Sequence, residues 1–152
     1  VLWRKAYDAY ETKKNGVIFK DHPYVSKVRL LIQAYETMDV EKIKSHYSPN
    51  ARFYDVMNSV PFDKVKSLEE EFKDFSSYTE ILEIVDIREY GFPDVLDYEG
   101  NDTVVISWWV MDFKNKKSGA TSTLFQHIVH HFNNDGEIVR ENYYFNPAQL
   151  PL

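Results

Sequence analysis

Three histidines lie close together in the sequence, at positions His127, His130 and His131, and neutral imidazole is a common metal ligand. The surrounding residues 119–132 are rich in Val, Ile, Thr and aromatic side chains, which predicts a β-strand. On a strand, His127 and His131 share a face but lie about 13 Å apart, while His130 points to the opposite face. Zinc needs each ligating nitrogen about 2.0–2.1 Å from one ion, so we predict no metal site.

Two adjacent tryptophans, Trp108 and Trp109, lie in a predicted strand and therefore point to opposite faces of a sheet. If residues 114–119 form a hairpin turn, Trp108 lies opposite Gln126 on the inner face. Trp108 then belongs either to the core or to the wall of a ligand pocket. The other tryptophan would lie on the outer face, where an aromatic side chain suggests an interface between two copies of the chain.

The composition excludes several classes of protein. With 18 basic and 24 acidic residues the formal net charge is −6, which argues against nucleic acid as a partner because phosphate binding needs clustered Lys and Arg. The absence of cysteine excludes disulfides, thiolate metal ligands and a cysteine nucleophile. No glycine-rich phosphate loop or GxSxG motif occurs, and we expect no cofactor.

Hydrophobic residues make up 43% of the chain and aromatic residues 16%, which predicts a folded domain with a substantial core. The longest apolar run, 104–111, is far shorter than the roughly 20 residues that cross a membrane, so we expect no membrane partner. The first residues do not form a signal peptide, but the sequence does not begin with Met. We therefore expect a soluble protein of unknown compartment, either cytoplasmic or exported after removal of a leader.

The first half of the sequence predicts helices, from apolar spacing and capping residues. They are expected over 3–14, after Pro23, after Asp39 and after Ser67. The last helix is expected to begin at the capping box Ser67-Leu-Glu-Glu70. The apolar residues of this helix are expected to face inward. The acidic run 69–71 in this helix predicts solvent-exposed surface.

The second half predicts strands. Val, Ile, Thr and aromatic residues are concentrated at 78–91, 102–114, 119–132 and 137–146, with turn-forming residues between these segments. A shorter strand is predicted at 51–56, after a break at Ser48-Pro49-Asn50. Four long strands in succession imply a strongly curved antiparallel sheet with the helices packed on one face, which is an α+β fold.

Residues 39–55, DVEKIKSHYSPNARFYD, combine an acidic helix cap, a short amphipathic helix, a turn and the strand motif Ala-x-Phe-x-Asp. This order of signals resembles the nuclear transport factor 2-like superfamily, in particular its SnoaL-like and ketosteroid-isomerase-like branch. Residues 132–146, FNNDGEIVRENYYFN, are similar to the closing hairpin of that family. From this resemblance we predict a SnoaL-like domain at 24–152, preceded by an N-terminal helical extension at 1–23.

The resemblance implies a conical α+β barrel, or cystatin-like α+β roll. In this fold a curved sheet wraps the N-terminal helices around an apolar cavity that is open at one end. The resemblance also implies a homodimer formed through the outer face of the sheet. The N-terminal extension is expected to pack over the sheet or to cover the cavity.

The resemblance places Asp55 at the position of the general base of the isomerases, which moves a proton between carbons of a steroid enone. Such a base needs an apolar pocket that raises the pKa of its carboxyl group. The two oxyanion donors of the isomerases correspond to Leu31 and Ile128, which are apolar, so steroid isomerisation is not expected. Tyr35, one helical turn after Leu31, is an alternative donor. Without a catalytic role, Asp55 would cap a turn or lie exposed at the end of its strand.

SnoaL-type cyclases use an aspartate on the last strand for acid–base chemistry, where this chain has Glu141-Asn142-Tyr143. Glu141 is the only carboxylate nearby. On the neighbouring strand, His130 shares the expected cavity face with Ile128. His130 is therefore either an acid or base near neutral pH or a pocket histidine without chemistry.

The predicted catalytic residues are Asp55, His130 and Tyr35. Ligand-binding residues are expected at Leu31, Trp108, Gln126, Ile128, Tyr143 and Phe145. We predict that the protein binds a small apolar molecule. We further predict that it is an isomerase-, cyclase- or hydratase-type proton-transfer enzyme with Asp55 as general base. The alternative is a non-catalytic ligand-binding module or protein-association dimer, and the sequence leaves open whether the chain is an enzyme.

Overall fold

The computed structural model describes residues 17–19, 21–57, 65–98 and 102–152. The helices in this part of the chain are α2 (Pro23–Glu36), α3 (Val40–Lys44), α4 (Leu68–Ile81) and the 3-10 helix η1 (Pro147–Gln149). The strands are β1 (Val17–Phe19), β2 (Tyr47–Asp55), β3 (Lys66–Ser67), β4 (Leu82–Glu89), β5 (Asp94–Tyr98), β6 (Asp102–Asn115), β7 (Thr121–Phe132) and β8 (Ile138–Tyr144). The predicted helix over 3–14 lies outside the described residues.

Helices α3 and α4 begin where the sequence supplies caps. The side chain of Asp39 accepts a hydrogen bond from the backbone N–H of Lys42 (3.1 Å) at the start of α3. At α4 the Ser67 hydroxyl accepts one from the N–H of Glu70 (3.3 Å), and the Glu70 carboxylate accepts one from the N–H of Ser67 (2.8 Å). Both predicted caps are confirmed.

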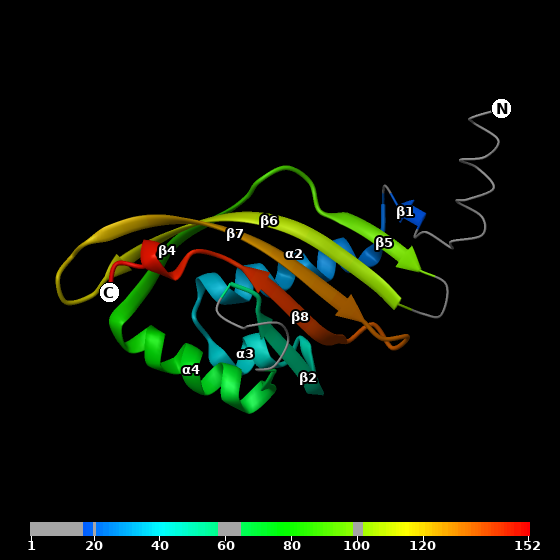
Figure 1. The fold of residues 1–152 in the computed structure, drawn as a ribbon, viewed down its shortest axis with the longest axis horizontal. Helices are drawn as coiled ribbons and strands as arrows, with labels where there is room; N and C mark the ends of the chain where they lie inside the picture. Colours follow the sequence, from blue (N-terminus) through cyan, green and yellow to red (C-terminus); the bar gives the residue numbers. More distant parts are fainter. Residues whose placement is uncertain (1–16, 20, 58–64, 99–101) are drawn as a thin grey trace.

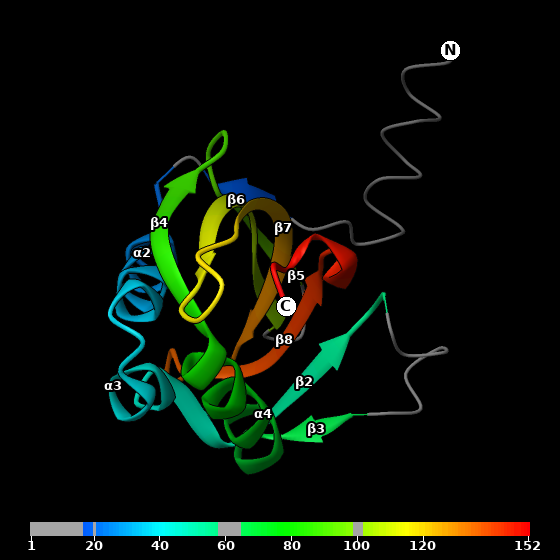
Figure 2. The same cartoon turned by 90° about the vertical axis from the view of Figure 1, so that its left-hand side faces the viewer.

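One curved sheet contains the eight described strands, in the order β1-β5-β6-β7-β8-β2-β3, with β4 paired to β6. One edge of β6 pairs with β7, and its other edge pairs first with β5 and then with β4. All these pairs are antiparallel except β2 with β8, which run parallel. Figures 1 and 2 show the sheet curving over α2, α3 and α4, which lie on its concave side. The predicted α+β fold with a strongly curved sheet is confirmed.

Three segments differ from their predicted local structure. Residues 78–81, predicted as strand, complete α4, and β4 begins only after them. Residues 94–98, predicted as part of a break, form β5, because β6 supplies a partner strand that leaves Val95 fully buried. Residues 48–50, predicted as a turn, lie within β2, whose pairing with β8 starts at Tyr47. In the case of 94–98 a strand outside the segment decides the conformation, which local propensity does not predict.

The β6–β7 hairpin is offset by one residue from the predicted register. Trp108 lies opposite His127, and Trp109 lies opposite Gln126. The prediction that Trp108 faces the cavity is therefore wrong, because a one-residue offset exchanges the two faces of a strand. Trp109 is the buried member of the pair, and its Nε1 donates a hydrogen bond to the Ser107 hydroxyl (2.9 Å).

Asn115 shapes the turn that sets this register. Its side-chain oxygen accepts hydrogen bonds from the N–H groups of Lys117 and Ser118, both at 2.9 Å. Gly119 follows with a φ of +74°, a backbone conformation that is strained for residues other than glycine. Pairing of the two strands therefore begins at Lys114 and Thr121.

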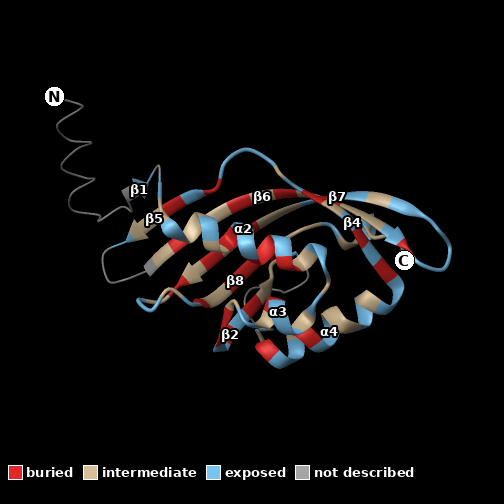
Figure 3. Ribbon diagram, turned by 180° about the vertical axis from the view of Figure 1, so that it is seen from behind, coloured by how far each residue is buried: buried red, intermediate tan, exposed pale blue. Residues whose placement is uncertain are grey.

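The core fills the concave side of the sheet. Figure 3 shows the buried residues of α2 and α4 turned toward the buried residues of the strands. Phe53 of β2 is almost fully buried, and its ring contacts those of Tyr47 and Phe72. This packing holds α4 against β2, and both elements contribute to the wall of the cavity described next.

Candidate functional site

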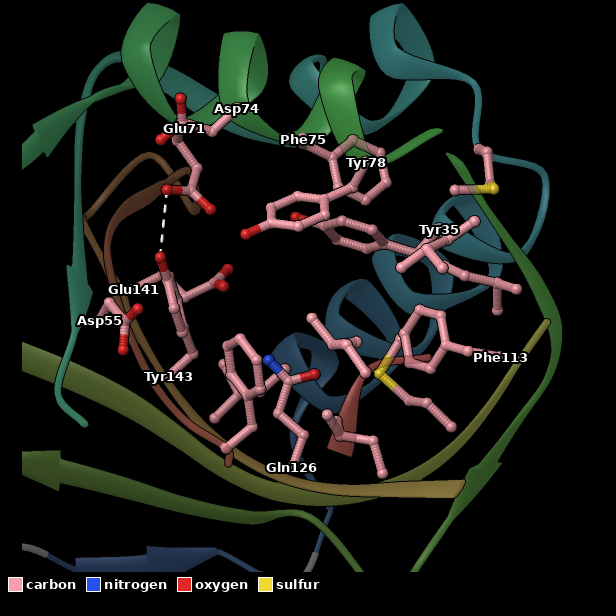
Figure 4. A pocket seen from close by; sticks show the side chains of 18 of the residues that line it. Tyr35, Asp55, Glu71, Asp74, Phe75, Tyr78, Phe113, Gln126, Glu141 and Tyr143 are labelled. Carbon is pink, nitrogen blue, oxygen red and sulfur yellow. Dashed lines mark hydrogen bonds between the residues drawn. The ribbon is translucent and has the colours of Figure 1, made fainter. Parts of the chain in front are cut away.

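A cavity of about 160 Å³ lies between the concave face of the sheet and the helices α2 and α4. Its wall is mainly apolar and aromatic, and Figure 4 shows Gln126 pointing into it. Among the described residues, the charged side chains on the wall are one lysine and four carboxylates: Lys66, Asp55, Glu71, Asp74 and Glu141. A largely apolar pocket with a few polar groups is the usual form of a small-molecule site.

Glu141 on β8 is the most deeply buried of these carboxylates, with 5% of the residue exposed. Its place follows from two strand pairings, because it lies opposite Phe53 of β2 and His130 of β7. Tyr47 donates a hydrogen bond to Glu141 Oε2, and His130 Nε2 lies 3.2 Å from the same oxygen. Figure 4 shows the carboxylate pointing into the cavity. One oxygen is therefore held by the protein while the group faces the cavity.

Two tyrosine hydroxyls extend this network, with Tyr35 Oη 3.3 Å from Tyr47 Oη. Burial raises the pKa of both phenols well above the ordinary value of 10, and the negative charge of Glu141 raises them further. Both hydroxyls therefore keep their protons at neutral pH. Tyr35 itself lies on the cavity wall.

Glu71 on α4 is the centre of a second polar group. The Tyr143 hydroxyl donates a hydrogen bond to Glu71 Oε2 (3.2 Å), and Lys66 Nζ lies 3.2 Å from the same oxygen and 2.8 Å from Asp74 Oδ2. Burial raises the pKa of Glu71, Lys66 opposes this shift, and the charge of Glu141 adds to it. The net shift is upward, so Glu71 retains a proton at higher pH than an ordinary carboxyl group. Burial also raises the pKa of Tyr143.

The structure places six of the nine predicted site residues on the cavity wall. They are Tyr35, Asp55, Gln126, Ile128, Tyr143 and Phe145. Asp55 is half-buried and lies beside Tyr143 at the edge of the group of side chains in Figure 4.

Three predicted site residues do not line the cavity. Leu31 is fully buried in the core. Trp108 lies on the outer face, where it stacks on His127 with 5.0 Å between the ring centroids. His130 is fully buried beside Glu141, so it contacts the site only through that carboxylate.

Glu71 and Lys66 were missed by sequence reasoning, which assigned the acidic run 69–71 to solvent. A usable signal existed, because Glu71 lies three residues after Leu68 and four before Phe75. That spacing puts its side chain on the inward face of α4. Tyr47 was missed because its role depends on Glu141, which is 94 positions away in the sequence.

Within the described residues, no group of three or more His, Asp and Glu side chains is arranged to hold a metal ion. None of the helices in the same part of the chain combines the length and apolar character needed to cross a lipid bilayer.

Residues 28–141 match the SnoaL-like domain family, so the chain belongs to this family. The resemblance stated from the sequence is confirmed. Among curated proteins, none gives a significant match.

Solved structures of low sequence identity share the fold. A ketosteroid isomerase-like protein from Erwinia carotovora atroseptica is 12% identical with a TM-score of 0.61, over 79% of this chain and 91% of its own. The epoxide hydrolase/cyclase-like enzyme SalBIII, described in pyran ring formation in polyether salinomycin, is 13% identical with a TM-score of 0.63, over 84% and 93%. An LEH-like epoxide hydrolase of M. tuberculosis is 10% identical with a TM-score of 0.59, over 83% and 84%. These likenesses concern the fold alone.

Proposed function

We propose that this protein is a proton-transfer enzyme that acts on a small apolar molecule bound in the cavity. The observation that carries the proposal is the pair of carboxylates on the wall of one largely apolar cavity, the buried Glu141 and the partly buried Glu71. Their surroundings differ, and two carboxylates in different surroundings are the usual basis of a base and an acid in one site.

In the proposed reaction, Glu141 takes a proton from the bound molecule. Its Oε2 accepts the hydrogen bond of Tyr47 and lies 3.2 Å from His130 Nε2, and its other oxygen is assigned to the substrate. Glu71 returns a proton at a second atom of the substrate, and the Tyr143 hydroxyl, which donates a hydrogen bond to Glu71 Oε2, orients this carboxyl group. The raised pKa of Glu71 suits it to this donation. The net result is an isomerisation or cyclisation, in which no electrons leave the substrate; in a hydration, Glu141 takes the proton from a water molecule that adds to the substrate.

Asp55 stays a predicted general base, and its position on the wall keeps it in the proposal. It lies opposite Tyr143 in the β2–β8 pairing, two positions along the strand from Glu141. Asp55 is therefore not part of the group formed by Glu141, Tyr47 and His130. We therefore assign the base to Glu141 first and test Asp55 in parallel.

Deuterium exchange tests the proposal without knowledge of the natural substrate. Small carbon acids such as phenylacetone, 2-tetralone and 3-methylcyclohex-2-enone are incubated with the protein in D₂O, and NMR follows loss of the hydrogens beside the carbonyl. Glu141→Gln should lower the exchange rate of any bound member at least about 100-fold, because general base catalysis typically contributes that much. Asp55→Asn should lower it less.

Glu83→Gln is the matched control, because Glu83 is an exposed carboxylate of β4 outside the cavity wall. Tyr47→Phe keeps the buried ring and removes only the hydroxyl, with its hydrogen bonds to Glu141 and Tyr35, so it should reduce exchange even if Glu141→Gln folds poorly. Ketones that bind without any exchange would point to a ligand-binding module that does not catalyse proton transfer.

We also propose that two copies of the chain associate through the outer face of the sheet. The rings of Trp108, His127 and Tyr144 contact one another there, with centroid distances of 5.0 and 5.2 Å. Phe125 is 45% exposed and contacts Tyr90, which is more exposed still. Aromatic side chains gathered on an exposed face are typical of protein–protein interfaces.

A further inference from the structure

Among the described residues, the cavity wall carries four carboxylates and one ammonium group, Lys66, which contacts Glu71 and Asp74 at 3.2 and 2.8 Å. The Lys66 side chain is also 34% exposed at the rim, so water screens part of its charge. No lysine or arginine in the described part of the chain forms an ion pair with Glu141, which is more deeply buried.

The carboxylate of Glu141 points into the cavity, and one of its two oxygens has no hydrogen-bond donor among the described residues. The side chain is 6% exposed, and both of its contacts, from Tyr47 and His130, go to Oε2. No donor in the described part of the chain hydrogen-bonds Oε1. A buried carboxylate is costly unless its oxygens are paired, so a ligand that brings a hydrogen-bond donor or a positive charge would offset this cost.

The rest of the wall favours the same kind of ligand. Figure 4 shows the rings of Tyr35, Phe75, Tyr78 and Phe113 around the cavity that Glu141 faces. The face of an aromatic ring carries negative electrostatic potential and attracts ammonium groups, most strongly where water is excluded. Aromatic rings and a carboxylate together bind an organic cation through its charge and its apolar parts at once.

We propose that the cavity binds a small apolar amine in its protonated form, with the ammonium group against Glu141 Oε1 and the hydrocarbon part among the aromatic rings. The inference rests on the proposed use of the cavity as the ligand site, and it names the substrate class. Anionic ligands are disfavoured by the same charges.

The test uses three probes of nearly equal shape: 3-phenylpropylamine, 3-phenylpropan-1-ol and 3-phenylpropanoate. Binding to the full chain is measured by ¹H–¹⁵N NMR titration at pH 7 and low salt, with the Gln126 side-chain amide as a reporter inside the cavity. The amine should bind at least about tenfold more tightly than the alcohol, as expected for a desolvated cation beside aromatic rings and a carboxylate. The carboxylate probe should bind most weakly.

Glu141→Gln should remove most of the preference for the amine and leave binding of the alcohol unchanged within about twofold, because only the charge is removed. Glu83→Gln, outside the cavity, should preserve the preference. If Glu141→Gln does not fold, Tyr35→Phe and Phe75→Leu separate the contributions, because loss of a ring should weaken the amine more than loss of a hydroxyl.

Equal binding of amine and alcohol, tighter binding of the carboxylate probe, or no binding of any probe would overturn the inference. None of these outcomes depends on turnover. If the preference for the amine fails, deuterium exchange with bound ketones would still support the proposed proton-transfer function. Failure of the amine inference can therefore be told apart from failure of the proposed function.

Discussion

At the scale of single residues, Glu71 and Glu141 show how one cavity gives two carboxylates different properties. Glu141 Oε2 accepts a hydrogen bond from Tyr47 and lies 3.2 Å from His130 Nε2. Glu71 Oε2, at the rim, accepts a hydrogen bond from Tyr143 and lies 3.2 Å from Lys66 Nζ. They also affect each other, because the charge of Glu141 helps to raise the pKa of Glu71. Removing one charge therefore changes the proton affinity of the other group.

We predict that Glu141→Gln lowers the pKa of Glu71 toward its ordinary value of 4.5. The sign follows because a neighbouring negative charge favours the protonated form of a carboxyl group, and the substitution removes that charge. A ¹³C NMR titration of the Glu71 carboxyl carbon, assigned with Glu71→Gln, measures the shift. A Glu71 pKa that stays at its wild-type value, or rises, would show that the two groups are not coupled.

At the scale of elements, the hairpin between β7 and β8 is fastened to α2. The side-chain oxygen of Asn133 accepts hydrogen bonds from the N–H groups of Asp135 and Glu137, and Gly136 adopts a φ of +73°. Lys27 of α2 donates a hydrogen bond to the Gly136 carbonyl. The turn thus contributes to the placement of β8, which carries Glu141.

We predict that Gly136→Ala destabilises the fold by about 1–2 kcal/mol, because a left-handed backbone strains a residue that has a Cβ. The new Cβ would also lie 2.4 Å from Lys27 Nζ and force that side chain to move. Gly119→Ala is the matched comparison, since Gly119 has a φ of +74° but no atom within 4 Å of the added Cβ. Urea denaturation of the two variants should give a larger loss for Gly136→Ala; equal losses would count against the contact with Lys27.

At the scale of the whole molecule, the curved sheet separates two environments. Its concave face carries the core and the cavity, and its outer face carries the aromatic side chains of β6, β7 and β8. Alternation along each strand assigns neighbouring residues to opposite faces. Trp108 and Trp109, adjacent in sequence, therefore belong to the outer face and the core.

We predict that the protein is a homodimer in solution and that Phe125→Glu shifts it toward monomers. The substitution places a charge at a 45% exposed position of the outer face, so it disfavours association and leaves the core intact. Leu30→Glu is the control, because Leu30 is 55% exposed on α2, away from that face. Sedimentation equilibrium of the two variants checks the prediction, and a wild-type monomer would contradict it.

Much of the fold was predictable because its signals are local. Apolar spacing located α2, the capping residues Asp39 and Ser67 located α3 and α4, and β-branched and aromatic segments located the long strands. Alternation along β7 also put Gln126 and Ile128 on one face, and both lie on the cavity wall.

The tertiary structure alone decided which strands pair, in what register, and which acids are buried together. The short segment 94–98 becomes a strand only because β6 lies beside it, and the turn at Asn115 moves Trp108 to the outer face. Glu141 meets Tyr47 only through the parallel pairing of β8 with β2, which joins distant parts of the chain. Local propensity and capping located most of the helices and long strands, because these effects act within a few residues. The cavity and its carboxylates depend on contacts between distant residues, so they emerge only when the sheet has closed around the helices.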